Sequence, residues 1–449
     1  MLSGQLRAAS YLTLHRMMKS RMPVYYREYL TQDRTRTTPD PTIALGEMLR
    51  HAVTTVPHYR EVSGASSGDV GATAIDDPLA FLARMPILTK ETIRAAGEQL
   101  TSSVGDRSSW YENATGGSTG EPLKLIQDAD HRARIVAIQE AYSTWAGGGL
   151  GRPEVFIWGS ERDIEEGSES FRNRFANALL QRSLLNAFRL DEPSMRRFLD
   201  VVRKGPRKLV LSYSQAGFEV ARFAATQRIA MPRQLGVIST AGMLYDHMRT
   251  QIEQTFGCQV FDRYGSREIG DMAGECGHGT GLHVLPWCCH VEILDDDDRP
   301  VPPGVEGDIV VTGLTNRAMP LIRYRIGDRA VLAPDESCPC GRIGPRLARV
   351  TGRTVDTFLT DSGVLVAGGY FVQLLAYRAW VGPFQILQPA PDEVEYRIVA
   401  RGEIPPGDRE EIVRGTRSAL GDACRVSFCM VDDIEPGPSG KRHYTRRMF

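Results

Sequence analysis

The sequence lacks any long apolar run and any excess of charge of one sign. None of its uninterrupted apolar stretches approaches the ~20 residues that a membrane-spanning helix needs. The formal net charge of the 449 residues is −1, which gives no electrostatic case for a nucleic-acid or anionic-membrane partner. Residues 1–22 scatter basic side chains among apolar ones, which indicates an amphipathic helix and not a signal peptide with a distinct apolar centre. We therefore expect a cytoplasmic protein that binds neither nucleic acid nor a membrane.

The length and the pattern of apolar segments indicate an α/β protein with more than one domain. A chain of 449 residues exceeds one ordinary core, and 42% hydrophobic with 24% charged residues is a globular composition. Residues 42–61 and 126–146 have helical periodicity, and further helical stretches alternate with short apolar runs. This alternation predicts a mostly parallel sheet. Its strands are expected at Val155–Trp158, Leu209–Leu211, Gly236–Ile238 and Gln259–Phe261.

The apolar segments become shorter and more closely spaced from about residue 283 onwards. Turns rich in Gly, Pro and Asp separate the segments His290–Leu294, Asp308–Thr312 and Ala330–Leu332, so we expect an antiparallel or barrel-like β subdomain there. After Arg353 the chain mixes two strand-like segments with one helix, which indicates a small α+β domain.

A glycine-rich segment follows the strand-like residues Ser109–Tyr111. Residues 114–122 read Ala-Thr-Gly-Gly-Ser-Thr-Gly-Glu-Pro, and Lys124 follows. Backbone without side-chain bulk can approach a polyphosphate closely, and the hydroxyls and the lysine add donors and positive charge. The segment does not fit the Walker A pattern, and a plain flexible loop is the alternative.

Four further segments resemble, together with this loop and in order and spacing, the adenylate-forming superfamily of acyl-CoA synthetases and adenylation domains. They are Tyr264–Glu268, Tyr324–Asp328, Gly352–Asp356 and Ser439–Lys441. The branch of phenylacetate-CoA ligase and coenzyme F390 synthetase-like proteins is similar in addition at Val56–Glu61 and Pro86–Glu91. The resemblance implies a large N-terminal domain over residues 1–352 and a mobile C-terminal lid domain over 353–449.

The resemblance implies a role for each segment. Tyr264 would stack on adenine, Glu268 would hold Mg²⁺, and Asp328 would accept hydrogen bonds from the ribose hydroxyls. Without the resemblance, Tyr264 could be a tyrosine of the core, Glu268 a solvated glutamate and Asp328 an aspartate in a turn. The catalytic residues implied are Thr115, Glu268 and Lys441. The ATP-binding residues implied are Thr115, Gly116, Gly117, Ser118, Thr119, Gly120, Lys124, Thr240, Ala241, Gly242, Tyr264, Gly265, Ser266, Asp328 and Arg353.

Two positions near the C-terminal domain qualify the match. Lys441 would neutralise the charge that develops between the carboxylate and the α-phosphate, whereas a basic tail ordinarily means solvated charge. The family usually has an acidic residue or lysine two places after its Gly-Arg arginine, where the domains hinge. Here Val355 occupies that place beside Asp356, which puts the identity of the hinge residue in doubt.

Eight cysteines in a cytosolic chain favour thiols or metal ligands over disulfides. Cys338 and Cys340 could clamp a soft cation, and Cys276 with one histidine would complete a structural Zn²⁺ site. We favour His283 over His278, and some members of the branch have a similar pattern; reduced buried thiols are the alternative. The other cysteines are expected to be structural strand or core residues: Cys258, Cys288, Cys289, Cys424 and Cys429.

The reaction implied is attack of a small carboxylic acid on the α-phosphate of Mg·ATP, followed by transfer of the acyl group from acyl-AMP to coenzyme A. The alternatives are transfer to an amine or a carrier protein, and a non-catalytic nucleotide-binding homologue. We place the acyl pocket near Trp145, Trp158, Tyr213 and Thr240, and the three aromatic residues among them suit a flat aryl acid.

Overall fold

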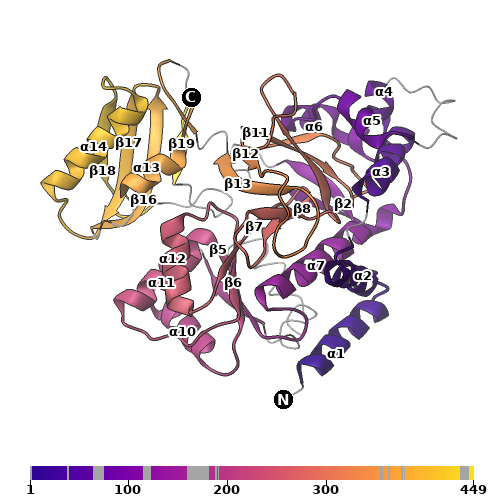
Figure 1. The fold of residues 1–449 in the computed structure, drawn as a ribbon, viewed down its shortest axis with the longest axis horizontal. Helices are drawn as coiled ribbons and strands as arrows, with labels where there is room; N and C mark the ends of the chain where they lie inside the picture. The colour runs from indigo at the N-terminus through magenta and orange to yellow at the C-terminus, as the bar shows by residue number, and fades with distance from the viewer. Residues whose placement is uncertain are drawn as a thin grey trace.

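The computed structural model has a large body and a smaller C-terminal unit (Figure 1). It describes residues 3–37, 40–63, 75–114, 123–158, 180, 182–187, 190, 192–353, 357–362, 365–375, 378, 380–434 and 444–449. None of the helices within these ranges has the length and apolarity to cross a membrane.

Short helices form the N-terminal part of the large body. Side-chain oxygens of Ser3, Asp40, Asp77 and Thr89 accept from backbone N–H groups at the starts of four of them, which fixes where each helix begins. The helices are α1 (Gly4–Met17), α2 (Met22–Thr35), α3 (Pro41–Thr55), α4 (Pro57–Val62), α5 (Pro78–Arg84) and α6 (Lys90–Ala96), followed by the 3₁₀ turns η1 (Gly97–Leu100) and η2 (Arg107–Ser109).

The first helix differs from the amphipathic helix expected over residues 1–22. The α-helix α1 ends at Met17, and a second helix starts at Met22. Within α1 only Tyr11 is buried, whereas Leu6 and Met17 are exposed. The apolar residues of α1 therefore do not line a single buried face.

One sheet of eleven strands runs through the large body, in the order β10-β11-β12-β13-β9-β8-β7-β6-β5-β3-β4. Its parallel strands are β3 (Glu154–Trp158), β4 (Arg182–Asn186), β5 (Leu209–Tyr213), β6 (Gly236–Thr240) and β7 (Val260–Ser266). Its other strands are antiparallel: β8 (Gly270–Glu275), β9 (Leu282–Val284), β10 (Cys289–Leu294), β11 (Glu306–Gly313), β12 (Tyr324–Leu332) and β13 (Arg346–Arg353).

The four expected parallel strands are present because both sheet faces are covered. Consecutive residues such as Val237 and Ile238 belong to different apolar clusters, one on each face of the sheet. The helices α10 (Glu192–Arg203), α11 (Ser214–Thr226) and α12 (Asp246–Phe256) contribute to the first cluster. The second contains Tyr142 of α7 (Ala129–Ser143), which continues into the turn η3 (Thr144–Ala146).

The expected antiparallel region is confirmed, and it continues the parallel sheet without closing into a barrel. Strand β7 pairs in parallel with β6 and antiparallel with β8, so the two regions are parts of one sheet. The strand order is open and ends at β10 and β4. Because β3, β5, β6 and β7 run parallel, their carboxyl ends lie at the same edge of the sheet. Open α/β sheets bind their ligands at this edge.

A hairpin carries the glycine-rich segment. Strand β1 (Trp110–Ala114) pairs antiparallel with β2 (Lys124–Asp128), and Ala114 lies opposite Lys124. Residues 115–122 between them, which include Thr115, Gly116, Gly117, Ser118, Thr119 and Gly120, lie outside the described residues.

The C-terminal unit has its own sheet and core. Four strands pair in the order β18-β17-β16-β19, and Tyr396, Ile386 and Phe371 are fully buried in its apolar cluster. Its elements are β14 (Thr357–Leu359), β15 (Leu365–Ala367), α13 (Gly368–Leu375), β16 (Val381–Ala390), β17 (Glu393–Ala400), α14 (Pro406–Leu420), β18 (Arg425–Met430) and β19 (Thr445–Arg447).

Candidate active site

Tyr264 and Asp328 meet, although 64 residues separate them in the sequence. The Tyr264 hydroxyl donates a hydrogen bond of 2.7 Å to Asp328 Oδ2. Asp328 on β12 also lies opposite Arg353 in the β12–β13 ladder. Three residues that are expected to contact the nucleoside, and that come from three segments of the sequence, are thus neighbours. They are the ring of Tyr264, the carboxylate of Asp328 and the backbone of Arg353.

Glycine is required at two positions of these segments. A Cβ on Gly265 would stand 2.7 Å from the carbonyl oxygen of Gly270, so only glycine allows β7 and β8 to approach this closely. Gly327 has φ +91°, a conformation that side-chain-bearing residues rarely adopt. Both glycines therefore shape the backbone that presents Tyr264 and Asp328.

The hairpin that carries the glycine-rich segment is tied to the Glu268 segment. The Gln127 side-chain amide donates to the carbonyl oxygens of Arg267 at 2.9 Å and Glu268 at 3.4 Å, and accepts from the Asn113 amide at 2.9 Å. The Glu268 carboxylate is buried and accepts from the Tyr324 hydroxyl at 3.3 Å. Lys124 is exposed at the start of β2.

Sequence reasoning missed Gln127 as a link between these segments. The sequence does contain a signal for it. Gln127 is two residues from the apolar Leu125 in a strand, and side chains two residues apart in a strand lie on the same face. Both are almost fully buried. A polar residue on a buried face needs a partner, and the Glu268 segment supplies it.

A lysine that sequence reasoning left without a role also reaches this site. Leu88 pairs with the Tyr324 segment through its N–H to Arg323 and its carbonyl oxygen to Arg325, both at 2.9 Å. Two residues later, Lys90 Nζ lies 3.8 Å from the position that a Cβ on Gly327 would take. A cation consequently stands beside the residue that precedes Asp328.

The segment Thr240–Gly242 forms a tight turn at the carboxyl end of β6. The Ser214 hydroxyl lies 3.2 Å from the carbonyl oxygen of Thr240 and 3.0 Å from that of Gly242. Ala241 has φ +65°, an uncommon value for a residue other than glycine. Such backbone outliers are concentrated at ligand-binding sites, which agrees with a role beside the nucleotide.

Three of the four residues expected around the acyl pocket lie near one another. Tyr213 is opposite Thr240 in the β5–β6 ladder, and its ring centroid is 4.7 Å from that of Trp158 on β3. All three are the last residues of parallel strands. The rings of Trp158 and Tyr213 therefore lie next to each other, beside Thr240, at the carboxyl edge of the sheet.

Trp145 does not belong to this group, so the expectation that it lines the acyl pocket is wrong. Its ring packs edge-on against His283 at 6.0 Å between centroids, and the Arg342 guanidinium lies 3.7 Å above it. Trp145 sits in the turn η3 after α7, and its ring faces His283 of β9. The cavity that it helps to line measures about 40 Å³, room for little more than water.

The four residues expected to bind zinc form a cluster. The potential ligand atoms of Cys276, His283, Cys338 and Cys340 all lie within 4.8 Å of one another. The two sulfurs of Cys276 and Cys338 are 3.6 Å apart, and Cys340 Sγ is 3.4 Å from His283 Nε2. Tetrahedral Zn²⁺ with bonds of about 2.3 Å separates its sulfurs by about 3.8 Å, so the donor set fits this metal.

Two members of the cluster have pKa values that suit a metal ligand, whereas burial raises the pKa of the Cys276 thiol to about 12. Burial, with the nearby Arg342 and Arg346, lowers the pKa of His283 to about 4, which keeps the imidazole neutral. Desolvation raises the pKa of the Cys338 thiol, but hydrogen bonds from Thr280 and Cys340 outweigh it and bring the pKa to about 7. His278 is exposed and lies outside the cluster.

A link from α2 supports the cluster from outside. The Arg342 backbone N–H donates to Cys340 Sγ at 3.4 Å, and the Arg342 side chain forms an ion pair of 2.7 Å with Asp33 of α2. The cluster thereby joins the loop between β12 and β13 to strands β8 and β9 and to the N-terminal helices.

The other cysteines divide between core and surface. Cys258, Cys288, Cys289 and Cys424 are buried, as expected for core residues, whereas Cys429 lies on β18 and is exposed. Cys429 is thus a strand residue, one of the two expected alternatives, and it is exposed on β18, the outer strand of its sheet.

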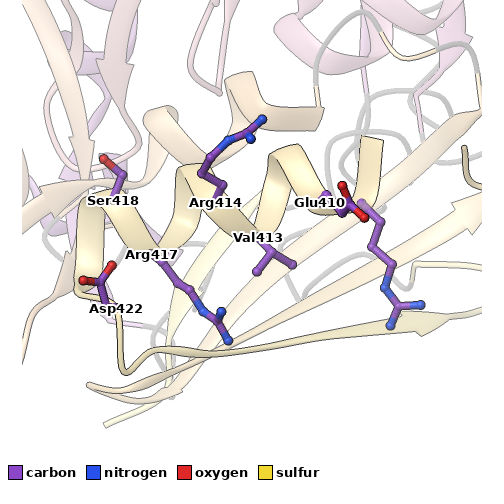
Figure 2. Close-up of a pocket in the computed structure, with 7 residues that line it drawn as sticks. Glu410, Val413, Arg414, Arg417, Ser418 and Asp422 are labelled. Atoms are coloured by element: carbon purple, nitrogen blue, oxygen red, sulfur yellow. The ribbon is translucent and has the colours of Figure 1, made fainter. Parts of the chain in front are cut away.

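A surface groove lies on the C-terminal unit, away from these segments. Figure 2 shows its seven lining residues on α14 and just after it: Arg409, Glu410, Val413, Arg414, Arg417, Ser418 and Asp422. It contains none of the residues expected to bind nucleotide, acid or metal. Lys441, Val355 and Asp356 lie outside the described residues, as does the side chain of Arg353.

Comparisons with known proteins agree with this arrangement. Residues 358–447 match the model of the CapK C-terminal domain. The chain is 21% identical to protein CapK of Staphylococcus aureus, over 82% of this chain and 80% of CapK. It is 27% identical to a phenylacetate-coenzyme A ligase of Aromatoleum evansii, over 88% of this chain and 90% of the ligase.

Solved structures share the fold. 2-Hydroxyisobutyryl-CoA ligase in the postadenylation state with 2-HIB-AMP has a TM-score of 0.68 at 18% identity, over 91% of this chain and 89% of that one. The same ligase in the thioesterification state has a TM-score of 0.57 at 19% identity, over 92% of this chain and 91% of that one. The amide bond synthetase McbA of Marinactinospora thermotolerans has a TM-score of 0.54 at 18% identity, over 76% and 71%. The homologues of this chain are thus phenylacetate-CoA ligases and CapK, and its fold is that of adenylate-forming ligases.

Proposed function

We propose that this protein is an AMP-forming ligase that activates a small carboxylic acid as acyl-AMP and transfers the acyl group to coenzyme A. The observation that carries the proposal is the convergence of Tyr264, Asp328 and the Arg353 position. No local feature of sequence requires these three residues to meet, whereas a nucleoside site does.

The nucleotide would lie along the carboxyl edge of the sheet. Tyr264 would stack on adenine beside the turn Thr240–Gly242, and Asp328 would accept from the ribose hydroxyls. The glycine-rich segment 115–120, held by the β1–β2 hairpin, would surround the phosphates with Lys124 nearby. The tie from Gln127 to residues 267 and 268 supports this order, because it joins that hairpin to the Glu268 segment.

Glu268 would hold Mg²⁺ against the phosphates. Its carboxylate is buried and accepts a hydrogen bond from the Tyr324 hydroxyl on Oε1, and Mg²⁺ in phosphate sites needs only one or two carboxylates. The ion would neutralise charge on the pyrophosphate that leaves when the acid oxygen attacks the α-phosphate. Lys441 would neutralise the charge between the two reacting groups.

We further propose a domain boundary between residues 352 and 353. Residues 1–352 would form the N-terminal domain and residues 353–449 the mobile lid that brings Lys441 to the site. Supporting this, β13 ends at Arg353 within the large sheet, whereas Phe358 of the next strand, β14, belongs to the core of the C-terminal unit. We also propose one structural Zn²⁺ on Cys276, His283, Cys338 and Cys340, which would staple the antiparallel region.

The substrate that fits best is an aryl acid. Trp158 and Tyr213 offer two adjacent rings at the end of the parallel strands, and flat rings pack well on such a wall. An amine acceptor in place of coenzyme A is the second candidate, since an amide bond synthetase shares the fold.

Pyrophosphate exchange tests the proposal. Labelled pyrophosphate should enter ATP only when a suitable carboxylic acid and Mg²⁺ are present, and a panel that includes aryl acids should show which acid is activated. Product analysis with coenzyme A or an amine as the acceptor then separates the two candidates. Exchange that occurs without any acid would contradict the proposal.

A further inference from the structure

A series of aromatic rings crosses from the large body to the C-terminal unit. Phe218 packs edge-on against His247 with 5.3 Å between centroids, and His247 stacks on Tyr245 at 5.9 Å and 10°. Tyr245 packs edge-on against Tyr444 at 6.0 Å, and Tyr444 against Phe384 at 4.7 Å. All four distances lie in the range of about 4.5–7 Å in which aromatic pairs attract.

The rings belong to elements of both parts of the molecule. Phe218 is on α11, and Tyr245 and His247 are at the start of α12, whereas Phe384 is on β16 of the C-terminal unit. Figure 1 shows α12 facing that unit across the junction. Tyr245 packs against the apolar cluster of the C-terminal unit, although it comes from the large body.

An ion pair lies at the same junction. Arg401, which follows β17, is 3.8 Å from Glu219 of α11, and Glu219 also pairs with Arg222. The Glu219 carboxylate is 83% shielded from solvent, so this contact is protected more than an ordinary surface pair. The aromatic and ionic contacts both start from α11 or α12, and together they fix how the two parts meet.

The two central rings are close in sequence to the proposed chemistry. Tyr245 is three residues after Gly242, the end of the turn placed beside adenine, and Tyr444 is three residues after Lys441. Three residues span at most about 10 Å. Tyr444 is itself fixed to the C-terminal sheet, because its carbonyl oxygen accepts from the Ile386 N–H at 2.7 Å. Seating Tyr444 on Tyr245 would therefore keep the chain that leads to Lys441 within this distance of the proposed nucleotide site.

We propose that the contact of Tyr245 with Tyr444, supported by Glu219 and Arg401, is the docking contact that holds the C-terminal unit in the arrangement for adenylation. This inference rests on the proposed function, and both tyrosines are positioning residues in it. The contact must separate when the unit turns to the thioester-forming arrangement. In agreement, the fold superposes better on the postadenylation state of 2-hydroxyisobutyryl-CoA ligase than on its thioesterification state, with TM-scores of 0.68 and 0.57.

The test measures the two half-reactions separately in the full-length protein. Tyr444→Ala and Tyr245→Ala should each slow acid-dependent ATP–pyrophosphate exchange about tenfold or more. The KM for ATP should stay within twofold, because the nucleotide contacts are intact. Formation of the thioester from supplied acyl-AMP should be unchanged or faster. Tyr444→Phe keeps the ring and should retain wild-type exchange.

Tyr370→Ala is the matched control, since Tyr370 packs on Phe371 within the C-terminal unit and not at the junction. It should leave both half-reactions unchanged. Equal loss in both half-reactions for Tyr444→Ala, or loss of exchange in the control as large as in Tyr444→Ala, would overturn the inference. Wild-type protein that exchanges with no acid would instead refute the proposed function itself.

A second experiment traps the contact. The double variant Glu219→Cys with Arg401→Cys, joined by a short thiol cross-linker, should continue to exchange pyrophosphate but should form no thioester. The same variant without the cross-linker should turn over normally. Repeated turnover by the fully cross-linked protein would show that the two parts need not separate here, which would overturn the inference.

Discussion

Replacing Asp328 with alanine should weaken the binding of ATP and leave the binding of the acid nearly unchanged. The Asp328 carboxylate accepts from the Tyr264 hydroxyl at 2.7 Å and lies opposite Arg353 in the ladder between β12 and β13. It is partly exposed, so a ribose can reach it. In the proposed complex the same carboxylate accepts from the ribose, and the alanine variant removes that acceptor.

The size of the loss follows from hydrogen bonds to a charged acceptor, which contribute about 1.5–3 kcal/mol. The expected loss of apparent ATP affinity is therefore about tenfold to a hundredfold. Tyr264→Phe keeps the ring but removes its donor, and water can resolvate a partly exposed carboxylate. A smaller loss of about 0.5–1 kcal/mol, or about two- to fivefold, is expected for it.

The assay is the dependence of pyrophosphate exchange on ATP at saturating acid, followed by the dependence on acid at saturating ATP. Asp335→Ala is a matched control, because Asp335 is an exposed aspartate just after β12. An Asp328→Ala protein with unchanged ATP dependence would refute the nucleoside site. An equal loss of acid affinity would show that the variant disturbs the whole edge of the sheet.

Three further outcomes are expected. Lys441→Ala should slow acyl-AMP formation by orders of magnitude yet turn over supplied acyl-AMP at a near-normal rate, and equal losses would remove its assigned role. Metal analysis should find about one zinc per chain. Cys338→Ser should lower the melting temperature, whereas Cys429→Ser, at an exposed strand position, should not. A protein without zinc would contradict the proposed site. Burial raises the pKa of Glu154 from about 4.5 to about 7, so the folded state binds the extra proton and stability should fall as pH rises through that window. Glu154→Gln should flatten this decline in thermal unfolding scans, and a variant with an undiminished decline would contradict the assignment.

Residues with strong local constraints could be predicted from the sequence. The parallel strands appear as short apolar runs because both of their faces are buried, and the structure has a strand at each expected place. The family resemblance supplied the pairing of Tyr264 with Asp328, which no local pattern contains. The cluster of three cysteines and one histidine could be predicted because these residue types recur at a spacing that metal sites use.

Features that depend on packing could not be predicted in the same way. The direction of Trp145 is set by where η3 ends and by the Arg342 guanidinium above it, 197 residues away in sequence. The merging of the two regions into one sheet depends on β7 pairing with both neighbours, which is a property of the assembled sheet. The aromatic contacts of Tyr245 and Tyr444 likewise exist only where two units meet.

Oxygen transfer from the acid tests the central claim most directly. The proposed chemistry joins a carboxylate oxygen to the α-phosphorus of ATP and breaks the bond between that oxygen and the acyl carbon when the acceptor attacks. With a carboxylic acid labelled with ¹⁸O in both positions, the AMP released after acyl transfer should contain one labelled oxygen, as measured by mass spectrometry. Label in inorganic phosphate with ADP as the nucleotide product, or AMP without label, would contradict activation through an acyl-adenylate.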